Sequence, residues 1–405
     1  MNIGSVVKNI REMSEVGVDI LLGRYPRFVY GMGLEQGQVP IFVFHSVEPD
    51  SFERMMEFLA VNRYVTLDSE DLYFYHNNPR KALPEKSIML TFDDGMKSVW
   101  TYAFPLLKKY GFKATTFLIP GRIPEQGEID LNLEDVWDSR VALSDIKIKT
   151  ANGYEALANW KEIENMHNSG VIDFQSHTNG HELIFTSPEI VGFLSPQALE
   201  RYHEFEFPKE CISASGDESN SPQYGRPLYT TAPRMSDKRR FIDSRDLSEA
   251  CIDYVMSQGK KFFDRPEWEA DLRGYVEEYK NKHPEDEKYE SRDDQYNAIY
   301  TDLHSSITEI EDRLHGKKVH SLCFPWGIGG QISKDAACTV GFKALYWGKC
   351  AGKLIYRRDD NPMEISRIGE DFFYLLPGKG RESLAGLVSK KIMRRLEKGS
   401  PFYGH

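Results

Sequence analysis

The chain has 405 residues, of which 40% are hydrophobic and 28% charged, and its formal net charge is -11 at pH 7. This length suffices for one large domain with insertions or for two smaller ones, and the composition is that of a globular protein. The negative charge argues against a general nucleic-acid binder, because neutralising phosphates requires concentrated Lys and Arg. An uncharged or cationic substrate fits this charge better.

Cysteine usage and the amino terminus indicate the cellular location of the protein. The odd count and the absence of CxxC spacing predict buried, reduced thiols, and neither a disulfide framework nor a structural zinc site. The amino terminus has no uninterrupted apolar stretch of signal-peptide length, and no segment reaches the roughly 18 apolar residues of a spanning helix. We therefore expect a cytoplasmic protein. The cysteines are Cys211, Cys251, Cys323, Cys338 and Cys350.

The first half of the chain alternates between apolar strands and amphipathic helices, a pattern typical of a parallel sheet or barrel. It follows a predicted N-terminal helical extension over residues 1–38. The strands are apolar throughout, as expected for strands buried on both faces. Asn159 is the expected N-cap of one helix and Gly170 its terminator. The predicted elements are strand 39–44, helix 52–60, strand 64–67, strand 87–92, helix 97–110, strand 114–119, helix 159–170 and strand 171–176.

A polar, charged segment interrupts this alternation between about 195 and 300. We interpret it as a mostly helical insertion in a main domain that spans 39–378. Residues 379–405 are predicted to form a basic C-terminal helix, which either contacts an anionic membrane surface or presents a solvated face. After the insertion the predicted elements are helix 298–315, strand 319–324, helix 331–339 and strand 342–347.

Four of the predicted strands end at polar or unusual residues. These are His45, Asp93, His177 and the segment 325–327. All four lie at the carboxyl ends of parallel strands, the face where barrel folds build their active sites.

The segment TFDDG at 91–95 places two adjacent carboxylates in a turn after a strand. One carboxylate can bind a divalent cation while its neighbour takes a proton from water bound to that cation. The alternative is an Asp-Gly turn in which an aspartate caps the following helix.

The segment HTNGH offers His177 and His181 on a strand end and the turn after it, so both imidazoles can face one cation. The alternative is a surface turn built on Asn179 and Gly180. With Asp94 as the third ligand, the pattern favours a catalytic metal site. One aspartate and two histidines suit zinc, with cobalt, nickel, iron or manganese as alternatives.

The motifs together resemble the polysaccharide deacetylases, carbohydrate esterase family 4, with their chitooligosaccharide deacetylase-like members. The runs VPIFVFHSV before the first motif and PLLKKYGFKATTFLIP after it are similar to that family as well. The resemblance implies a distorted (β/α) barrel and removal of the N-acetyl group of an N-acetylhexosamine in a glycan or glycan precursor. The motifs are TFDDG at 91–95, HTNGH at 177–181 and CFPWG at 323–327.

The same resemblance implies a role for each motif residue. Asp93 is the general base toward a metal-bound water, and the metal ligands are Asp94, His177 and His181. The backbone N–H of Trp326 is the implied donor to the oxyanion, and its indole is expected to wall the pocket and stack on a sugar face.

Two departures from the family pattern concern the proton donor. The usual arginine of the third motif is absent before Phe324, and Arg367 in ISRIG stands where the family has a histidine acid. Arginine cannot act as an acid at neutral pH, because its pKa is far too high. The leaving amine is then protonated by Asp93, or by another histidine such as His45. His45, Pro325 and Arg367 are also candidates for the pocket wall.

Two other functions are compatible with these residues. One is a catalytically impaired homologue that binds glycans, which the two departures motivate. The other is a hydrolase of the same fold that acts on a non-sugar amide. A phosphatase of the haloacid dehalogenase type is disfavoured, because its two aspartates are two residues apart and Asp93 and Asp94 are adjacent. Without a secretion signal, we expect an intracellular glycan precursor as substrate.

Overall fold

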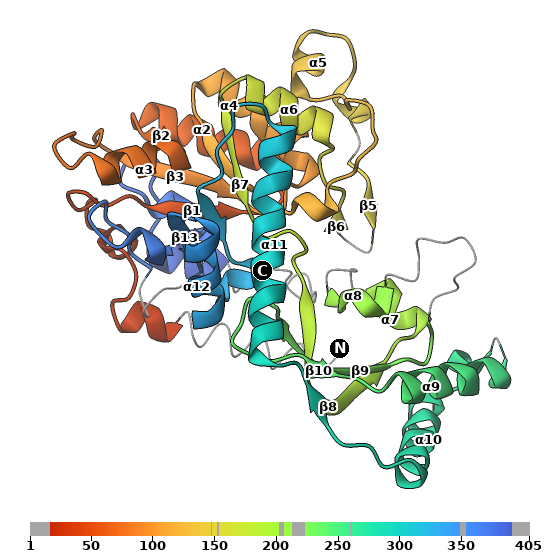
Figure 1. Cartoon of the computed structure of the whole chain (residues 1–405). Coiled ribbons are helices and arrows are strands. Elements are labelled where there is room, and N and C mark those ends of the chain that lie inside the picture. Colours follow the sequence, from red (N-terminus) through yellow and green to blue (C-terminus); the bar gives the residue numbers. More distant parts are fainter. Residues whose placement is uncertain are drawn as a thin grey trace.

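A nine-stranded parallel sheet forms the centre of the molecule (Figure 1). Eight of its strands follow the order β14-β13-β12-β7-β4-β3-β1-β15, and β2 pairs with β3 outside that path. The strands are β1 (Ile41–Phe44), β2 (Val65–Leu67), β3 (Ser87–Phe92), β4 (Ala114–Leu118), β7 (Ile172–Ser176), β12 (Ser321–Cys323), β13 (Ala344–Trp347), β14 (Ile365–Ser366) and β15 (Ile368–Gly369). The computed structural model describes residues 17–146, 148–151, 154–201, 206–212, 223–259, 261–348 and 354–390.

The two ends of this sheet are consecutive in the sequence. β14 pairs with β13 and β15 pairs with β1, both in parallel. One residue, Arg367, separates β14 from β15. The segment therefore connects the two edges of the sheet, which forms a nearly closed barrel. This confirms the expected α/β class and barrel.

Helices cover the outside of the barrel (Figure 1). Their apolar faces and the outward residues of the strands share the largest hydrophobic cluster, which includes Phe42, Leu90 and Phe174. Packing against the sheet stabilises these helices more than their local propensity does. The helices are α2 (Pro49–Val61), α3 (Ser69–Asn77), α4 (Phe104–Tyr110), α5 (Leu133–Trp137), α6 (Trp160–Asn168), α11 (Arg292–Arg313) and α12 (Gln331–Val340).

A second apolar cluster fills the barrel itself. It contains Ile41, Met89, Phe117, Cys323 and Tyr346. Alternate residues of a strand point to opposite faces, so these inward residues are separated by outward ones that belong to the outer cluster. Because both faces are apolar, the strands read in the sequence as continuous hydrophobic runs.

Local signals in the sequence set several element boundaries. The predicted cap of α6 is confirmed: Asn159 accepts the backbone N–H of Glu162, whose side chain accepts the N–H of Asn159 in return. The helix predicted over 97–110 is confirmed as one helical stretch, in which Val99–Ala103 is π-helical and leads directly into α4.

Helix α11 begins at Arg292, six residues before the predicted start at 298. Ser291 caps it in a reciprocal box with Asp294. This capping signal lies in a highly charged run, so the sequence pattern places the first residues of the helix in the insertion.

The segment between the two halves of the barrel forms a lobe with small apolar clusters of its own, one around Phe193, Leu247 and Phe262, the other around Phe185 and Tyr229. A long antiparallel pair, β8 (Leu183–Phe193) with β9 (Pro227–Pro233), joins it to the barrel and was not predicted. The remaining elements here are α7 (Pro196–Arg201), α8 (Lys209–Ile212), β10 (Phe241–Ile242), α9 (Arg245–Gln258), α10 (Trp268–Lys282) and β11 (Lys288–Tyr289), and a small hairpin of β5 (Thr150–Ala151) and β6 (Tyr154–Glu155) lies in the first half of the barrel.

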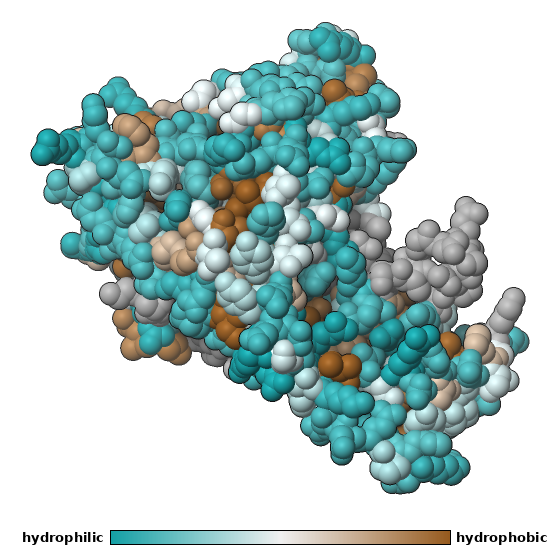
Figure 2. Space-filling view, viewed as in Figure 1, coloured by the Kyte–Doolittle hydropathy of each residue, from teal (hydrophilic) through white to brown (hydrophobic). Residues whose placement is uncertain are grey.

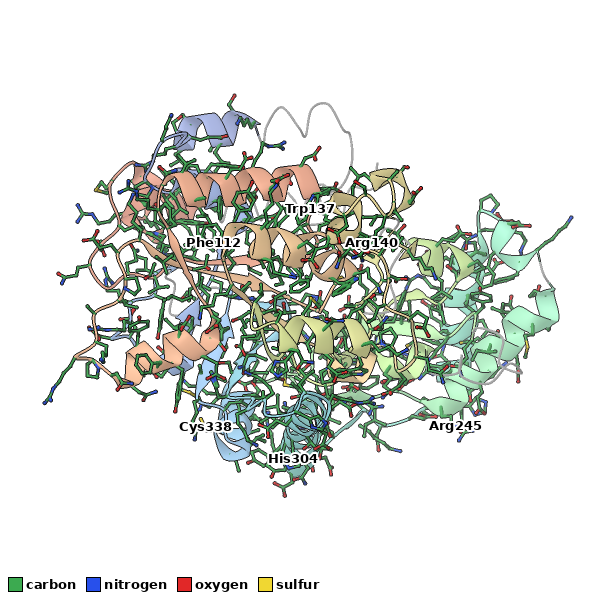
Figure 3. All side chains as sticks on the ribbon, turned by 90° about the horizontal axis from the view of Figure 1, so that it is seen from above. Phe112, Trp137, Arg140, Arg245, His304 and Cys338 are labelled. Carbon is green, nitrogen blue, oxygen red and sulfur yellow. The ribbon has the colours of Figure 1, made fainter. Side chains whose placement is uncertain are left out.

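Three of the four cysteines that the structure describes are buried. Cys211, Cys251 and Cys323 are buried free thiols, but Cys338 is exposed, so its predicted burial is wrong. Cys338 lies on the outer edge of α12 in Figure 3, where solvent replaces a packing partner. Hydrophilic side chains dominate the face shown in Figure 2. Cys350 lies outside the described residues.

Both ends of the chain are described only in part. Most of the predicted N-terminal extension, residues 1–16, lies outside the described residues, as does 391–405 of the predicted basic helix. Lys390 is described, and its ammonium contacts the carboxylate of Glu382 at 2.5 Å. No helix among the described residues is both long and apolar enough to cross a bilayer.

The cap of α6 generates a stability prediction. Replacing Asn159 by Ala leaves the N–H of Glu162 without its acceptor and should lower the free energy of unfolding by about 1 kcal/mol. Urea unfolding measures the change. Asn168→Ala, at the exposed last residue of the same helix, is the control. Equal stability of Asn159→Ala and wild type would contradict the assignment.

Candidate active site and metal centre

The inward positions of the strands continue into the site. On β3, Met89 belongs to the barrel interior, Thr91 is fully buried, and Asp93 follows two residues later on the same face. The same alternation carries His45 past the end of β1 and His177 past the end of β7. The site is therefore the carboxyl-terminal mouth of the barrel, as the sequence predicted.

Three side chains at this mouth converge on one point. The Nε2 atom of His177 lies 3.4 Å from Oδ1 of Asp94, and Nε2 of His181 lies 3.7 Å from the same oxygen. One ligand atom from each of the three residues lies within 4.8 Å of the others. Asp94 Oδ1 is buried and has no hydrogen-bond partner among the described residues. A buried, unsatisfied carboxylate oxygen facing two imidazoles fits a divalent cation.

The contacts of the histidines favour metal binding. Nδ1 of His177 lies 2.9 Å from the carbonyl oxygen of Cys323, which fixes the ring with Nε2 toward Asp94. Burial lowers the pKa of His177, and it lowers the pKa of His181 well below the ordinary value. Both rings are therefore neutral at neutral pH, the form that binds a cation.

A second group of possible ligands, Asp93, His177 and Cys323, shares one histidine with the first. Burial raises the pKa of the Cys323 thiol well above its ordinary value, so the thiolate that a metal needs is disfavoured. Arg367 already occupies both oxygens of Asp93. The group of Asp94, His177 and His181 fits a cation better.

The backbone at the mouth is strained. Among the described residues seven non-glycine residues have positive φ, and four of them are Asp94, Thr178, His181 and Trp326. Such conformations persist only where the surrounding structure holds them, and they cluster at functional sites. Gly95 follows with φ 84°, and a Cβ there would lie 2.8 Å from the side chain of Leu118. The turn after β3 therefore requires this glycine.

An ion pair inside the barrel fixes Asp93. The guanidinium of Arg367 donates to Oδ1 of Asp93 at 2.6 Å and to Oδ2 at 2.7 Å. Each of the two side chains is only 4% exposed. A third donor contact joins Arg367 to the hydroxyl of Thr91 at 3.2 Å. The pair is bidentate and desolvated, which is the strongest geometry for such a contact.

The two adjacent aspartates have opposite electrostatic environments. Burial raises the pKa of Asp93, but the charge of Arg367 and the hydrogen bonds that its guanidinium donates outweigh it and hold the pKa below its usual range. Burial and the charge of Asp93 raise the pKa of Asp94 to about 8 in the absence of a cation. Asp93 is thus ionised at neutral pH, and Asp94 gains its charge most easily beside a cation.

These groups line a pocket of about 110 Å³. His45, Trp326 and Arg367 lie in its wall, as expected for pocket residues. The indole of Trp326 packs on the ring of His181 with centroids 4.1 Å apart. Pro325 does not line the pocket. It is buried at the start of the turn Pro325–Gly327, which carries Trp326.

The structure adds residues that the sequence analysis missed. Val43 on β1 and Gly348 just after β13 also line the pocket. Glu206 reaches the pocket from the insertion, and the neighbouring Phe207 is buried in the lobe's core. Strand alternation could have identified Val43, since it lies two residues before His45. No local pattern marks Glu206, because only the tertiary fold returns the insertion to the mouth.

Residues 80–223 match the family model for polysaccharide deacetylase. This match contains the first two motifs and confirms the resemblance there. A putative polysaccharide deacetylase of Bacillus subtilis is 36% identical over 90 residues, which are 20% of this chain and 32% of that protein. The poly-beta-1,6-N-acetyl-D-glucosamine N-deacetylase of Staphylococcus aureus is 24% identical over 135 residues, 33% of this chain and 38% of that protein. The chain thus spans about a third of the length of these curated relatives.

Among solved structures, a de-N-acetylase from Aggregatibacter actinomycetemcomitans aligns with a TM-score of 0.49 and 15% identity, covering 82% of this chain and 94% of that one. A deacetylase domain from Bordetella bronchiseptica also has a TM-score of 0.49 and 15% identity, covering 83% of this chain and 96% of that one.

The ion pair between Asp93 and Arg367 predicts a pH-dependent loss of stability. In the presence of a metal chelator, Arg367→Met should lower the free energy of unfolding near pH 7 by about 3–5 kcal/mol, because it leaves the buried carboxylate of Asp93 unpaired. The lowered pKa of Asp93 contributes stability above the unfolded value and loses it as pH falls, so the deficit should shrink below about pH 4.

Urea unfolding at both pH values measures this deficit. The control is Arg140→Met, which removes an arginine that is 65% exposed and pairs with Asp135 and Asp138. That change should alter stability by at most about 1 kcal/mol. A deficit that stays constant with pH would rule out Asp93 as its origin.

Proposed function

We propose that this chain, which carries a polysaccharide deacetylase domain, is a metal-dependent hydrolase of the N-acetyl group of an N-acetylhexosamine in a glycan or glycan precursor. The observation that carries the proposal is the arrangement of Asp94, His177 and His181 around one point, with the ionised Asp93 beside them. The match to the deacetylase family supports the reaction class. The printed name of the staphylococcal relative supports an N-acetylglucosamine polymer as the first substrate to test.

Asp94, His177 and His181 would hold the cation. Zinc suits this ligand set, with cobalt, nickel, iron and manganese as alternatives. Bound there, a divalent cation would acidify the attacking water and polarise the acetyl carbonyl.

Asp93 acts as the general base in this proposal. Its carboxylate takes a proton while the water oxygen forms a bond to the acetyl carbon. The backbone N–H of Trp326 donates to the oxyanion that develops on the carbonyl oxygen. When the carbon–nitrogen bond breaks, the amine nitrogen receives a proton, and acetate and the free amine leave.

The charge of Arg367 affects which group can protonate the leaving amine. Because its charge keeps the pKa of Asp93 low, a protonated Asp93 is a strong acid and gives its proton up readily. We therefore assign both proton transfers to Asp93. His45, whose Nε2 lies 4.0 Å from Oδ2 of Asp93, is the other candidate.

The size of the pocket limits what it encloses. Its volume of about 110 Å³ is well below the roughly 300–1,000 Å³ of sites that enclose drug-sized ligands. We therefore assign it to the acetamido group, with the sugar ring at the mouth against the indole of Trp326.

Acetate release is the test. Oligosaccharides of N-acetylglucosamine should yield acetate with zinc-loaded protein, and chelation should abolish the release until metal is restored. Asp93→Asn should lower kcat/KM by about 100- to 10,000-fold, as expected for loss of a general base. Asp359→Asn, at a carboxylate 77% exposed, is the matched control and should match wild type.

Two results would favour the other functions. Zinc and glycan binding without acetate from any substrate would indicate an impaired homologue that binds glycans. Acetate from N-acetylated peptides but not from sugars would indicate a non-sugar amide hydrolase.

The assignment of the proton donor makes a separate prediction. His45→Gln should lower kcat by less than about tenfold, well short of the roughly 100-fold loss that removal of a general acid causes. The pH profile of kcat for this variant against wild type is the measurement. A loss of the larger size that is confined to the alkaline limb of the profile would transfer the role of acid to His45.

A further inference from the structure

The turn that carries the two histidines is held by a carboxylate that is not one of the proposed ligands. Asp302, on α11, accepts the backbone N–H of Asn179 with Oδ1 and that of Gly180 with Oδ2, each at 2.9 Å. Both oxygens thus accept from two of the three residues that separate His177 from His181.

This turn needs external support. Thr178 has φ 66° and His181 has φ 50°, both in the left-handed region that non-glycine residues avoid. Such a conformation is maintained by its surroundings and not by local preference. Any relaxation of this backbone would move the imidazole of His181, because His181 is the last residue of the turn.

Further contacts come from the barrel and from α11. The backbone N–H of Gly121 donates to the carbonyl of Asn179 at 3.1 Å. Nε of Arg122 donates to the carbonyl of Gly180 at 3.2 Å. One turn along α11 from Asp302, the hydroxyl of Ser306 lies 2.7 Å from that of Ser176.

The insertion contacts the residue that directly follows His181. The backbone N–H of Arg234, just after β9, donates to the carbonyl of Glu182 at 2.8 Å. The guanidinium of Arg234 pairs at 2.8 Å with Glu290, and the two side chains are only 7% and 8% exposed. Glu290 lies directly before the cap of α11, so the insertion and Asp302 belong to one connected support.

We propose that Asp302 is a positioning residue of the metal centre, through which α11 and the insertion hold His177 and His181 in the geometry for one cation. Asp302 contacts neither the cation nor the substrate; its two acceptor bonds set the turn. This inference rests on the proposed metal site, and it concerns affinity for the cation, not turnover.

The test uses zinc alone and the full chain. Zinc affinity is measured by competition with a chromophoric chelator for wild type, Asp302→Ala and Asp302→Asn. The asparagine variant keeps the shape but turns an N–H toward one of the two backbone donors. Both variants should bind zinc about 10- to 100-fold more weakly, as for other groups that orient metal ligands. Asp302→Glu, which keeps the carboxylate, should recover part of that loss.

A second carboxylate on the same helix is a matched control. Glu311 accepts the backbone N–H of Val319 at 2.9 Å, at the opposite end of the barrel. Glu311→Ala should lower the melting temperature of the metal-free protein and leave zinc affinity unchanged. If Asp302→Ala does not fold, the isosteric Asp302→Asn carries the comparison.

The outcomes separate this inference from the proposed function. Wild-type zinc affinity in the Asp302 variants overturns it, as does an equal loss in Glu311→Ala, or no zinc binding by wild type. Weakened zinc binding in the Asp302 variants supports it even if wild type releases no acetate. In that case the proposed function fails and the positioning role stands.

Discussion

The buried ion pair between Asp93 and Arg367 couples the barrel to its site. Arg367 lies between β14 and β15, where the two edges of the sheet meet, and its guanidinium reaches the carboxylate at the end of β3. Desolvating either charge alone costs several kcal/mol, so neither side chain is stable there without the other. Closing the barrel and keeping Asp93 ionised are therefore one physical requirement.

That requirement also separates two aspartates that are adjacent in the chain. Asp93 faces inward and receives the charge of Arg367, which keeps it ionised. Asp94 turns away through a left-handed backbone and faces His177 and His181, where burial and its neighbour's charge oppose ionisation. One carboxylate is thus suited to proton transfer, and the other to a cation that compensates its charge.

The insertion also contributes residues to the mouth of the barrel. Figure 1 shows α11 running from the lobe along the barrel, and Asp302 and Ser306 on this helix contact the segment that carries the histidines. Glu206 enters the pocket wall from the lobe. In Figure 3 the elements around Arg245 project away from the barrel, so only part of the lobe serves the site directly.

The sequence by itself determined the alternating elements, the end of β3 just before Asp93, and the histidines of the second motif, because apolar runs, caps and short motifs are local signals. It left the role of Arg367 open and gave no sign of Asp302 or Glu206. Arg367 contacts Thr91 and Asp302 contacts Asn179, and in each case the partner is more than a hundred residues away in the chain. Glu206 lies in a lobe that carries no motif. Only the tertiary structure decided those pairings, since closing the barrel and returning the insertion to its mouth bring distant residues together.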